Sequence, residues 1–351
     1  MKKIIIMLGS YIDSVNAQDI NCYFIAKYLN KRKFEVHALK RTKTFNMPDV
    51  HTHFVSSNRI KNKIDKFSLL KLINADVYYL PRVEKTDILF AYLYGKKKCI
   101  ISSIEIQNVY SNRVYHNFFN TYIYDYFCIS KFLQNLNIKY WGRKPALLYL
   151  GVECFNNIPR YREKLNNIIF VGSIEQRKRP DAFVRIASQF PELNFKMIGD
   201  GSLLKNIEDE AYQNCVQNIR FLGRLENSKV LNEMMSADLL LVLSEKEGLP
   251  KVVLEAASVG VPTIYENRNY SIDYIVNGVN GYGVESDNDV IKKIKLLEKN
   301  QETFRMLSKN AFDEAKIYTW DKLIIEWENY FIDTNNDFCH SMKSNVRKNK
   351  G

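Results

Sequence analysis

The chain of 351 residues is 46% hydrophobic and carries a formal net charge of +12, so it is long and apolar enough for two α/β domains. No segment approaches about 20 uninterrupted apolar residues, which excludes a membrane-spanning helix from the prediction. The six cysteines show no CxxC or other metal-ligand spacing, a pattern typical of reduced thiols in a cytosolic protein.

The basic excess lies in residues 1–150, whereas residues 151–351 are close to neutral. No RNA- or DNA-binding motif accompanies it, so we expect no nucleic-acid partner. One interpretation is an anionic membrane face or an anionic lipid-linked acceptor, where each basic residue contributes about 1 kcal/mol. The other is plain solubility.

Residues 1–155 alternate predicted strands and helices, which favours a Rossmann-like domain. The start resembles a signal peptide, but its apolar run is too short and lacks a small-residue cleavage site, so we interpret it as the first strand. The predicted strands span residues 3–8, 35–39, 76–80, 99–103, 126–129 and 146–150, and the predicted helices span residues 17–31, 63–73, 87–94, 114–122 and 131–136.

In residues 59–72 of this domain, apolar side chains such as Ile64 alternate with basic ones. One interpretation is a helix that lies on an anionic lipid surface. The other is an ordinary amphipathic helix packed on the sheet. Lys61, Lys63 and Lys66 are the basic residues through which the first interpretation can be tested.

The second half begins with a polar stretch, residues 156–164, which predicts a linker. A second Rossmann-like domain follows at residues 167–318. Residues 319–334 form a predicted helix whose apolar face includes Trp320 and Trp327 and needs a groove to bury it. Residues 335–351 are polar and basic and are predicted to be disordered. The predicted strands of the second domain span residues 168–171, 194–198, 219–222, 239–243, 263–265 and 281–284.

Residues 244–255 are the most informative segment. They follow an apolar run typical of a strand buried on both faces, and Pro250 predicts the first turn of a helix. In open α/β sheets, ligands bind at the carboxyl ends of strands, where a helix N-terminus favours an anion. Glu247 and Glu255 are expected to face the same side, and carboxylates accept hydrogen bonds from sugar hydroxyls.

Glu247 and Glu255 are spaced as Glu-x7-Glu, and residues 256–262 and 277–283 follow with further glycines and a proline. This order resembles the retaining family-4 (group 1) glycosyltransferases. The resemblance implies the GT-B fold, in which two Rossmann-like domains face each other and a C-terminal helix crosses back to the first domain. It also implies that the first domain binds the acceptor and the second binds the sugar-nucleotide donor.

The resemblance further implies roles for individual residues. Glu255 is expected to hold the ribose hydroxyls and Glu247 the donor sugar. A basic pair after the first strand of the second domain is expected to neutralise the diphosphate of the leaving group. The predicted catalytic residues are Glu247, Lys178, Arg177 and Glu105, and the predicted donor-binding residues are Glu255, Gly248, Leu249, Pro250, Lys251, Gly172, Gly199 and Gly201.

The first domain departs from the family pattern. Asn16 and Ala17 stand where relatives carry a Gly-Gly pair, which permits close approach of the backbone to a phosphate. Glu105 stands at a strand end where relatives often carry a histidine. It is interpreted as a ligand of a sugar hydroxyl, as a base, or as a surface cap.

No metal site is predicted. The five histidines show no ligand spacing, although His51 and His53 would lie on one face if this segment formed a strand, and a structural role is expected for them. The Asp287-Asn-Asp289 sequence precedes a helix and is interpreted as its cap. Two side-chain cations are expected to replace the metal that many sugar transferases use.

We therefore predict a cytoplasmic glycosyltransferase that uses a UDP- or GDP-sugar without a cofactor or metal. It would transfer a hexose-type sugar, with retention, to a lipid-linked or surface polysaccharide acceptor, and in the membrane interpretation it would lie peripherally on the inner face of the plasma membrane. Two alternatives remain: a non-catalytic partner subunit with the same fold, and a sugar-nucleotide epimerase. Turnover in vitro distinguishes them.

Overall fold

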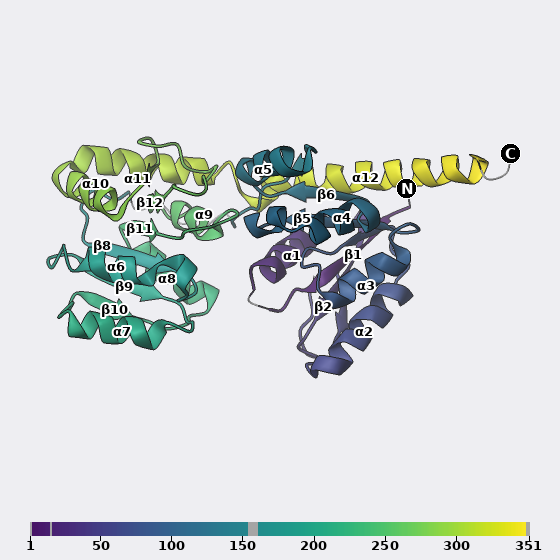
Figure 1. The fold of residues 1–351 in the computed structure, drawn as a ribbon, viewed down its shortest axis with the longest axis horizontal. Helices are drawn as coiled ribbons and strands as arrows, with labels where there is room; N and C mark the ends of the chain where they lie inside the picture. Colours follow the sequence, from purple (N-terminus) through teal and green to yellow (C-terminus); the bar gives the residue numbers. More distant parts are fainter. Residues whose placement is uncertain (1, 15, 154–160, 349–351) are drawn as a thin grey trace. The chain divides into compact units, whose positions relative to one another are not determined.

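The chain divides into two compact units (Figure 1). The first unit combines residues 1–150 with residues 320–351, and the second comprises residues 151–319. The linker predicted at residues 156–164 lies largely outside the described residues. The computed structural model describes residues 2–14, 16–153 and 161–348.

The described part of the first unit contains a seven-stranded parallel sheet in the order β3-β2-β1-β4-β5-β6-β7. The chain runs outward from the central β1 in one direction and then in the other, which is the doubly wound arrangement that the alternating pattern predicts. The edge strand β3 was not among the predicted strands. The strands are β1 (Ile4–Tyr11), β2 (Phe34–Lys40), β3 (His51–Phe54), β4 (Val77–Tyr79), β5 (Cys99–Ile104), β6 (Asp125–Cys128) and β7 (Ala146–Leu147).

Helices connect these strands and pack in groups. One group places α2 beside α3 and α3 beside α4, and α1 packs beside the C-terminal helix α12. The helices are α1 (Ala17–Tyr28), α2 (Arg59–Leu72), α3 (Lys85–Tyr94), α4 (Arg113–Tyr122), α5 (Lys131–Trp141) and α12 (Trp320–Lys348), with a 3₁₀ turn η1 (Gln107–Ser111).

The C-terminal helix α12 returns to the first unit, as predicted; in Figure 1 it is the yellow helix. Its predicted apolar face is buried. Trp327 donates a hydrogen bond from its indole Nε1 to the Tyr149 carbonyl at 3.0 Å, and Trp320 stacks on Phe24 with ring centroids 5.8 Å apart. The helix therefore fills a groove of the first unit with aromatic side chains.

The prediction of disorder after residue 334 is wrong, because α12 continues to Lys348. Phe338 packs edge-on against Tyr124, with ring centroids 5.0 Å apart, and Phe331 is fully buried. The spacing of seven residues puts these two rings on the same helix face. Apolar contact therefore extends the helix beyond the point where polar composition alone predicts its end.

The structure also corrects the basic face predicted for α2. Lys66 is 1% exposed and its Nζ lies 2.8 Å from Asp87 Oδ1 of α3. Lys66 shares a helix face with Leu70, four residues on, and that face turns toward the protein interior. Lys66 is therefore a buried ion-pair partner, whereas Lys61 and Lys63 are exposed.

The second unit contains, within its described residues, a six-stranded parallel sheet in the order β10-β9-β8-β11-β12-β13. All six strands coincide with predicted ones to within one residue at either end. β11 is buried along its whole length, as its apolar sequence predicts. The strands are β8 (Asn167–Val171), β9 (Asn194–Ile198), β10 (Ile219–Phe221), β11 (Leu239–Val242), β12 (Thr263–Glu266) and β13 (Gly281–Val284).

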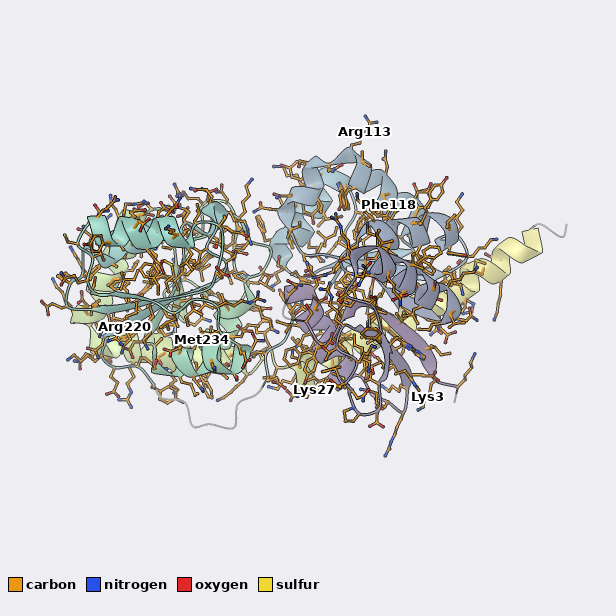
Figure 2. All side chains as sticks on the ribbon, turned by 90° about the horizontal axis from the view of Figure 1, so that it is seen from below. Lys3, Lys27, Arg113, Phe118, Arg220 and Met234 are labelled. Carbon is orange, nitrogen blue, oxygen red and sulfur yellow. The ribbon has the colours of Figure 1, made fainter. Side chains whose placement is uncertain are left out.

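Two groups of helices pack on this sheet. α6 packs beside α7 and α10, whereas α8 and α11 both pack beside α9. Side chains fill the space between the helices and the sheet (Figure 2), and Met234 of α8, labelled there, is fully buried. The elements are η2 (Gln176–Lys178), α6 (Pro180–Ala187), α7 (Leu204–Gln213), α8 (Asn227–Ser236), α9 (Lys251–Ala257), α10 (Asp287–Lys299) and α11 (Gln301–Ala315).

Candidate functional site

The candidate site of the second unit lies at the carboxyl ends of β8 and β11. These strands are neighbours in the sheet, and the chain leaves β8 toward β9 but leaves β11 toward β12. Such a reversal of strand order opens a crevice between the loops that follow the two strands, and ligands of open α/β sheets bind there. The segments that follow β8 and β11 carry the predicted residues Gly172, Arg177, Lys178 and Glu247.

Three glycines bring the backbone segments at this edge into close contact. A Cβ atom on Gly199, whose φ is +146°, would lie 1.7 Å from the Gly172 carbonyl oxygen. A Cβ atom on Gly201 would lie 2.4 Å from the Ile174 carbonyl oxygen. Only glycine fits either position without moving the backbone. Gly199 and Gly201 therefore shape the edge, whether or not they also touch a ligand.

Lys178 and Glu247 form an ion pair across the two loops. The Lys178 side chain is 15% exposed and that of Glu247 is 11% exposed, so water screens the pair less than it screens a surface pair. Lys178 also lies over Gly172, where an added Cβ would be 3.9 Å from the Lys178 Nζ. The structure thus brings three of the predicted residues together.

Arg177 occupies the outer side of the same cluster. Its Nη1 lies 3.8 Å from Glu247 Oε1, and half of its side chain is exposed. Its carbonyl oxygen accepts a hydrogen bond of 2.8 Å from the Glu245 amide, which ties the loop after β8 to the loop after β11. One half-buried carboxylate therefore faces two cations.

Arg179, the third member of the basic run, has a structural role. It adopts a left-handed conformation with φ +52° before α6 and pairs with Glu266, which is 2% exposed. Its Nη2 also lies 2.7 Å from Asp287 Oδ1. The ordering of Arg179 by these carboxylates fixes the direction of the two residues before it. The predicted cap is wrong in detail, because the N-cap of α10 is Ser286, and Asp287 and Asp289 lie in the first turn of the helix.

Helix α9 carries the second glutamate. Pro250 is its N-cap rather than its first helical residue, and the helix has only seven residues, so its dipole can contribute little. Glu255 and Lys251 stand four residues apart on one face. Burial lowers the pKa of Lys251 from its ordinary value, although the carboxylates of Glu255 and Glu153 oppose the shift.

Sequence reasoning missed Tyr270. Its ring is 3% exposed, and its hydroxyl has no hydrogen-bond partner among the residues that the structure describes. Burial, reinforced by the charge of Glu247, raises its pKa well above the ordinary value. A buried hydroxyl without a partner costs free energy, which marks Tyr270 as a second polar group beside Glu247. No spacing in the sequence signals it.

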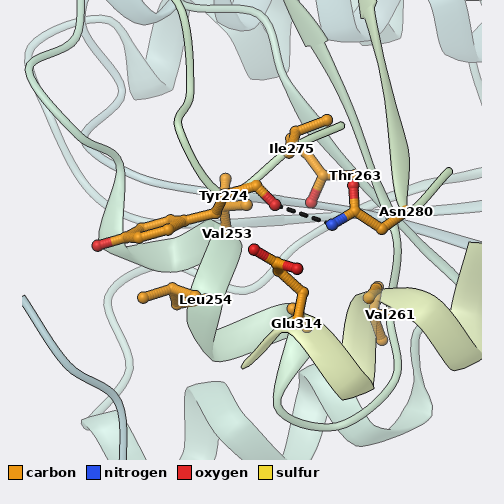
Figure 3. A pocket seen from close by; sticks show the side chains of 10 residues that line it. Val253, Leu254, Val261, Thr263, Tyr274, Ile275, Asn280 and Glu314 are labelled. Atoms are coloured by element: carbon orange, nitrogen blue, oxygen red, sulfur yellow. Dashed lines mark hydrogen bonds between the residues drawn. The ribbon is translucent and has the colours of Figure 1, made fainter. Parts of the chain in front are cut away.

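A small cavity lies behind α9 (Figure 3) and is lined by Val253 and Leu254 of that helix. Its volume is about 10 Å³, which suits one water molecule and is far below the several hundred Å³ of a typical ligand pocket. Beside it, Asn280 Nδ2 donates to the Tyr274 carbonyl at 2.9 Å. This cavity is too small to be a nucleotide site.

Glu105 belongs to the first unit and follows β5. Burial raises its pKa to about 7, against the opposing effects of a hydrogen bond from Ser103 and the charge of Arg82. Ser103 Oγ lies 2.8 Å from Glu105 Oε1. Arg82 also pairs with Asp19 of α1, where Nη2 and Oδ2 are 3.2 Å apart. This group of charges lies where β1, β4 and β5 end.

The loop after β1 carries Asn16 where a glycine pair is expected, and side-chain contacts around Asp19 order this loop. The Asn16 side chain donates to Asp19 Oδ2 at 3.2 Å, and Asp19 is fully buried. The loop is therefore ordered by side-chain hydrogen bonds rather than by close approach of a bare backbone. Arg82 follows a short buried strand and carries no motif, so sequence reasoning missed it.

The two doubly wound parallel sheets, with a C-terminal helix that returns to the first unit, define the GT-B class of α/β folds. Residues 155–314 match the model of the glycosyl transferases group 1 family. The matched part of the chain carries Lys178, Glu247 and Glu255.

The chain is also similar in sequence to proteins named as glycosyltransferases. An uncharacterised glycosyltransferase of Methanocaldococcus jannaschii is 28% identical over 63% of this chain and 62% of its own length. The Escherichia coli UDP-Gal:α-D-GlcNAc-diphosphoundecaprenol α-1,3-galactosyltransferase is 29% identical over 42% of this chain and 41% of its own length. The chain thus spans less than two thirds of each of these relatives.

A solved structure extends the likeness in fold to both units. Anabaena HepE, whose crystal structure holds UDP-glucose, superimposes with a TM-score of 0.71 over 98% of this chain and 100% of that chain. The two sequences are 13% identical, so this likeness concerns the fold alone.

Proposed function

We infer that the protein is a glycosyltransferase that transfers a hexose-type sugar from a nucleotide-diphosphate sugar, with retention of configuration. The observation that carries this inference is the cluster of Lys178, Arg177 and Glu247 at the strand-order reversal of a group 1 glycosyl transferase domain. Two cations suit a diphosphate, and a half-buried carboxylate suits sugar hydroxyls. No other described part of the second unit combines these features with the crevice.

We propose a role for each group of this cluster and for Glu255. Lys178 and Arg177 would neutralise the negative charge that develops on the leaving diphosphate. Glu247 would accept hydrogen bonds from the donor sugar, and Glu255 from the ribose. Before the donor binds, the Lys178–Glu247 pair holds both side chains in place, so little reorganisation is needed when phosphate and hydroxyl groups replace the pair. The backbone of residues 248–250 would face the leaving phosphates.

A UDP-sugar is the proposed donor. The E. coli relative is named for UDP-galactose, and HepE was crystallised with UDP-glucose. GDP-sugars are the alternative donors, since none of the described residues by itself selects the base. The Gly172–Lys178 loop binds the part that all nucleotide-diphosphate sugars share.

A lipid-linked or surface polysaccharide is the proposed acceptor, and the first unit is its proposed site. The E. coli relative acts on a diphosphoundecaprenol-linked sugar, as its name states. Glu105 is the proposed acceptor-side acid–base group, because a carboxyl whose pKa is about 7 can bind and release a proton near neutral pH.

We also propose that α2 and α3 rest on an anionic lipid surface on the cytoplasmic side. Ile60, Ile64 and Leu72 of α2 are 72%, 60% and 79% exposed, and Leu89 and Tyr92 of the neighbouring α3 are 49% and 61% exposed. Lysines surround these apolar groups, and together they suit the boundary between lipid headgroups and acyl chains. None of the described helices is long and apolar enough to cross a membrane.

The basic character extends beyond these two helices. Lys3 before β1 and Arg113 at the start of α4 are exposed and project outward in Figure 2. Lys61, Lys63 and Lys71 of α2 are also exposed. The first unit therefore offers several basic groups to an anionic surface, each worth about 1 kcal/mol where it comes near the lipid.

A thermal-shift screen against UDP, GDP, ADP and CMP and their sugar conjugates tests the donor assignment. A nucleotide at 100 times its dissociation constant should add about 2.7 kcal/mol to the stability of the second unit. Release of nucleotide diphosphate together with a new glycoside then shows transfer, whereas a new nucleotide sugar shows epimerisation. Binding without turnover on any acceptor would favour the non-catalytic partner.

Metal independence is part of the proposal, since Lys178 and Arg177 supply positive charge at the diphosphate. Transfer should therefore proceed at the same rate in EDTA as in untreated buffer. A loss of activity that magnesium or manganese restores would contradict it.

A further inference from the structure

Four titratable side chains gather on one face of β2 and the edge strand β3. In the register of this parallel pair, His37 lies opposite His51, and Leu39 lies opposite His53. Since side chains alternate along a strand, Glu35 and His37 share the face that His51 and His53 occupy. The cluster belongs to the first unit, and nothing in the proposed transfer reaction uses it.

Three of these residues are placed as metal ligands. One ligand atom each from Glu35, His37 and His51 can be chosen so that all three lie within 4.8 Å of one another, and Glu35 Oε1 is 3.0 Å from His37 Nε2. Donor atoms about 2.0–2.1 Å from a tetrahedral zinc ion lie roughly 3.3 Å from each other. The three donors therefore already lie near that spacing.

His53 completes the arrangement from behind. Its Nε2 lies 2.9 Å from His37 Nδ1, and the two rings are stacked with an interplanar angle of 6°. If His37 Nδ1 donates this hydrogen bond, its lone pair is at Nε2, the atom that faces Glu35. A metal-ligating histidine characteristically has its second ring nitrogen held in this way.

The cluster is open to an ion from solvent. His51 is exposed, and Glu35 and His37 are half-buried, so the fourth position of a tetrahedral ion would be left to water. Two imidazoles and one carboxylate suit zinc, copper or nickel, whereas magnesium and calcium prefer oxygen ligands throughout.

We propose that Glu35, His37 and His51 bind a divalent transition-metal ion of the zinc class, and that His53 orients His37. The ion links β2 to the four-residue edge strand β3 and so closes the loop of residues 41–50. A link across such a loop stabilises the native state by restricting the unfolded chain. The role of the ion is to hold the edge strand β3 against β2.

Zinc alone is the probe for the test. Full-length protein is stripped with a chelator, dialysed, and titrated with ZnCl₂ in a calorimeter, with MgCl₂ as the comparison. We expect one zinc ion per chain, no magnesium binding, and at least tenfold weaker zinc binding by His37→Ala and His51→Ala. Glu35→Gln, which keeps the side-chain size, should also weaken it. The control is His340→Ala, which removes an exposed imidazole on α12.

His53 needs its own comparison, because it acts through His37. His53→Ala should weaken zinc binding, and His53→Gln, which keeps a hydrogen-bond acceptor, should restore part of the affinity. Zinc should also slow hydrogen exchange of the β3 amides in the wild type but not in His51→Ala. Equal zinc affinity in wild type and His37→Ala, or no stoichiometric binding by wild type, would overturn the site, whatever the transferase assays show. Circular dichroism without zinc checks that each variant is folded.

Discussion

Glu255, on the half-buried face of α9, is the group proposed to hold the ribose. Glu255→Ala removes a charged acceptor whose hydrogen bonds typically contribute about 1.5–3 kcal/mol, so nucleotide affinity should fall by roughly 10- to 150-fold. Calorimetry with the nucleotide diphosphate measures the change. Glu298→Ala removes an exposed carboxylate of α10 and should bind as wild type does. Unchanged affinity in Glu255→Ala would remove this residue from the nucleotide site.

Lys178 should matter more for turnover than for binding. Its charge is proposed to stabilise the leaving diphosphate, and loss of one such group typically lowers kcat by about 100-fold. Steady-state kinetics of Lys178→Ala should therefore show a large fall in kcat and a smaller change in KM. Lys246→Ala, an exposed lysine in the loop after β11, is the matched control. Equal effects on kcat and on donor affinity would point to simple ground-state binding.

Glu105 gives a prediction about pH. Because burial raises its pKa to about 7, the native state holds a proton that the unfolded chain has lost above about pH 4.5. The free energy of unfolding of the first unit should therefore fall by no more than about 3 kcal/mol as pH rises from about 4.5 to about 7. Above pH 7 it should level off. Glu105→Gln lacks this carboxyl.

The thermal unfolding of wild type and of Glu105→Gln is measured at pH 5 and at pH 8. The midpoint of wild type should drop relative to that of Glu105→Gln at the higher pH. If Glu105 is the acceptor-side base, the rate of transfer by wild type should also rise as pH increases around 7. The rate of transfer by Glu105→Gln should not show this rise. A stability difference that does not depend on pH would show that the Glu105 carboxyl titrates far from 7.

At the scale of elements, α2 and α3 provide the test of lipid binding. The exposed lysines Lys61, Lys63 and Lys71 are changed together to glutamate, while Lys66 is kept because its ion pair with Asp87 is buried. Flotation with vesicles of anionic lipid should be lost, since the surface charge is reversed. Binding by wild type should weaken with salt, because exposed charges are screened beyond about 8 Å at physiological ionic strength.

The control reverses the same number of charges elsewhere. Lys295, Lys299 and Lys309 are exposed lysines of the second unit, and their change to glutamate should leave flotation intact. Flotation that survives the change on α2 would exclude this helix, and a wild type that does not float would favour a soluble acceptor.

The elements of the second unit were predictable because local sequence and tertiary structure agree there. β11 is apolar throughout and buried throughout, and the residues that its flanking loops bring together, such as Lys178 and Glu247, follow strands whose ends a parallel sheet must align. Tyr270 and Arg82 were missed for the opposite reason. The carboxylates that mark them, Glu247 for Tyr270 and Asp19 for Arg82, come from other segments of the chain, and neither residue belongs to a recurring spacing.

Two other differences between prediction and structure also arise from contacts with distant segments. The sequence predicts Lys66 to be a surface lysine, because its partner Asp87 comes from a different helix, α3. The composition after residue 334 is mostly polar, but a few apolar residues such as Phe338 hold α12 to the first unit. The Glu35, His37 and His51 cluster also has no ligand spacing along the chain, because strand register rather than sequence distance brings it together. The cluster can be recognised only once the pairing of β2 with β3 is known.

At the scale of the whole molecule, α12 makes the first unit depend on residues 320–348. Trp327 is fully buried, and its ring lies 4.9 Å from that of Phe127. Trp327→Ala should destabilise the first unit by about 3–5 kcal/mol, through lost packing and a cavity. Calorimetric scanning should show a lower transition for this unit and an unchanged one for residues 151–319. Glu326→Ala, an exposed neighbour, should shift neither.

The return of α12 also sets an order of events during synthesis. Residues 151–319 form one contiguous unit and can fold as soon as they leave the ribosome. The first unit cannot be completed then, because Phe24, Phe34 and Tyr79 pack against aromatic rings of α12. The half that is made first is thus finished last, and until then its uncovered aromatic groove is a natural target for chaperones.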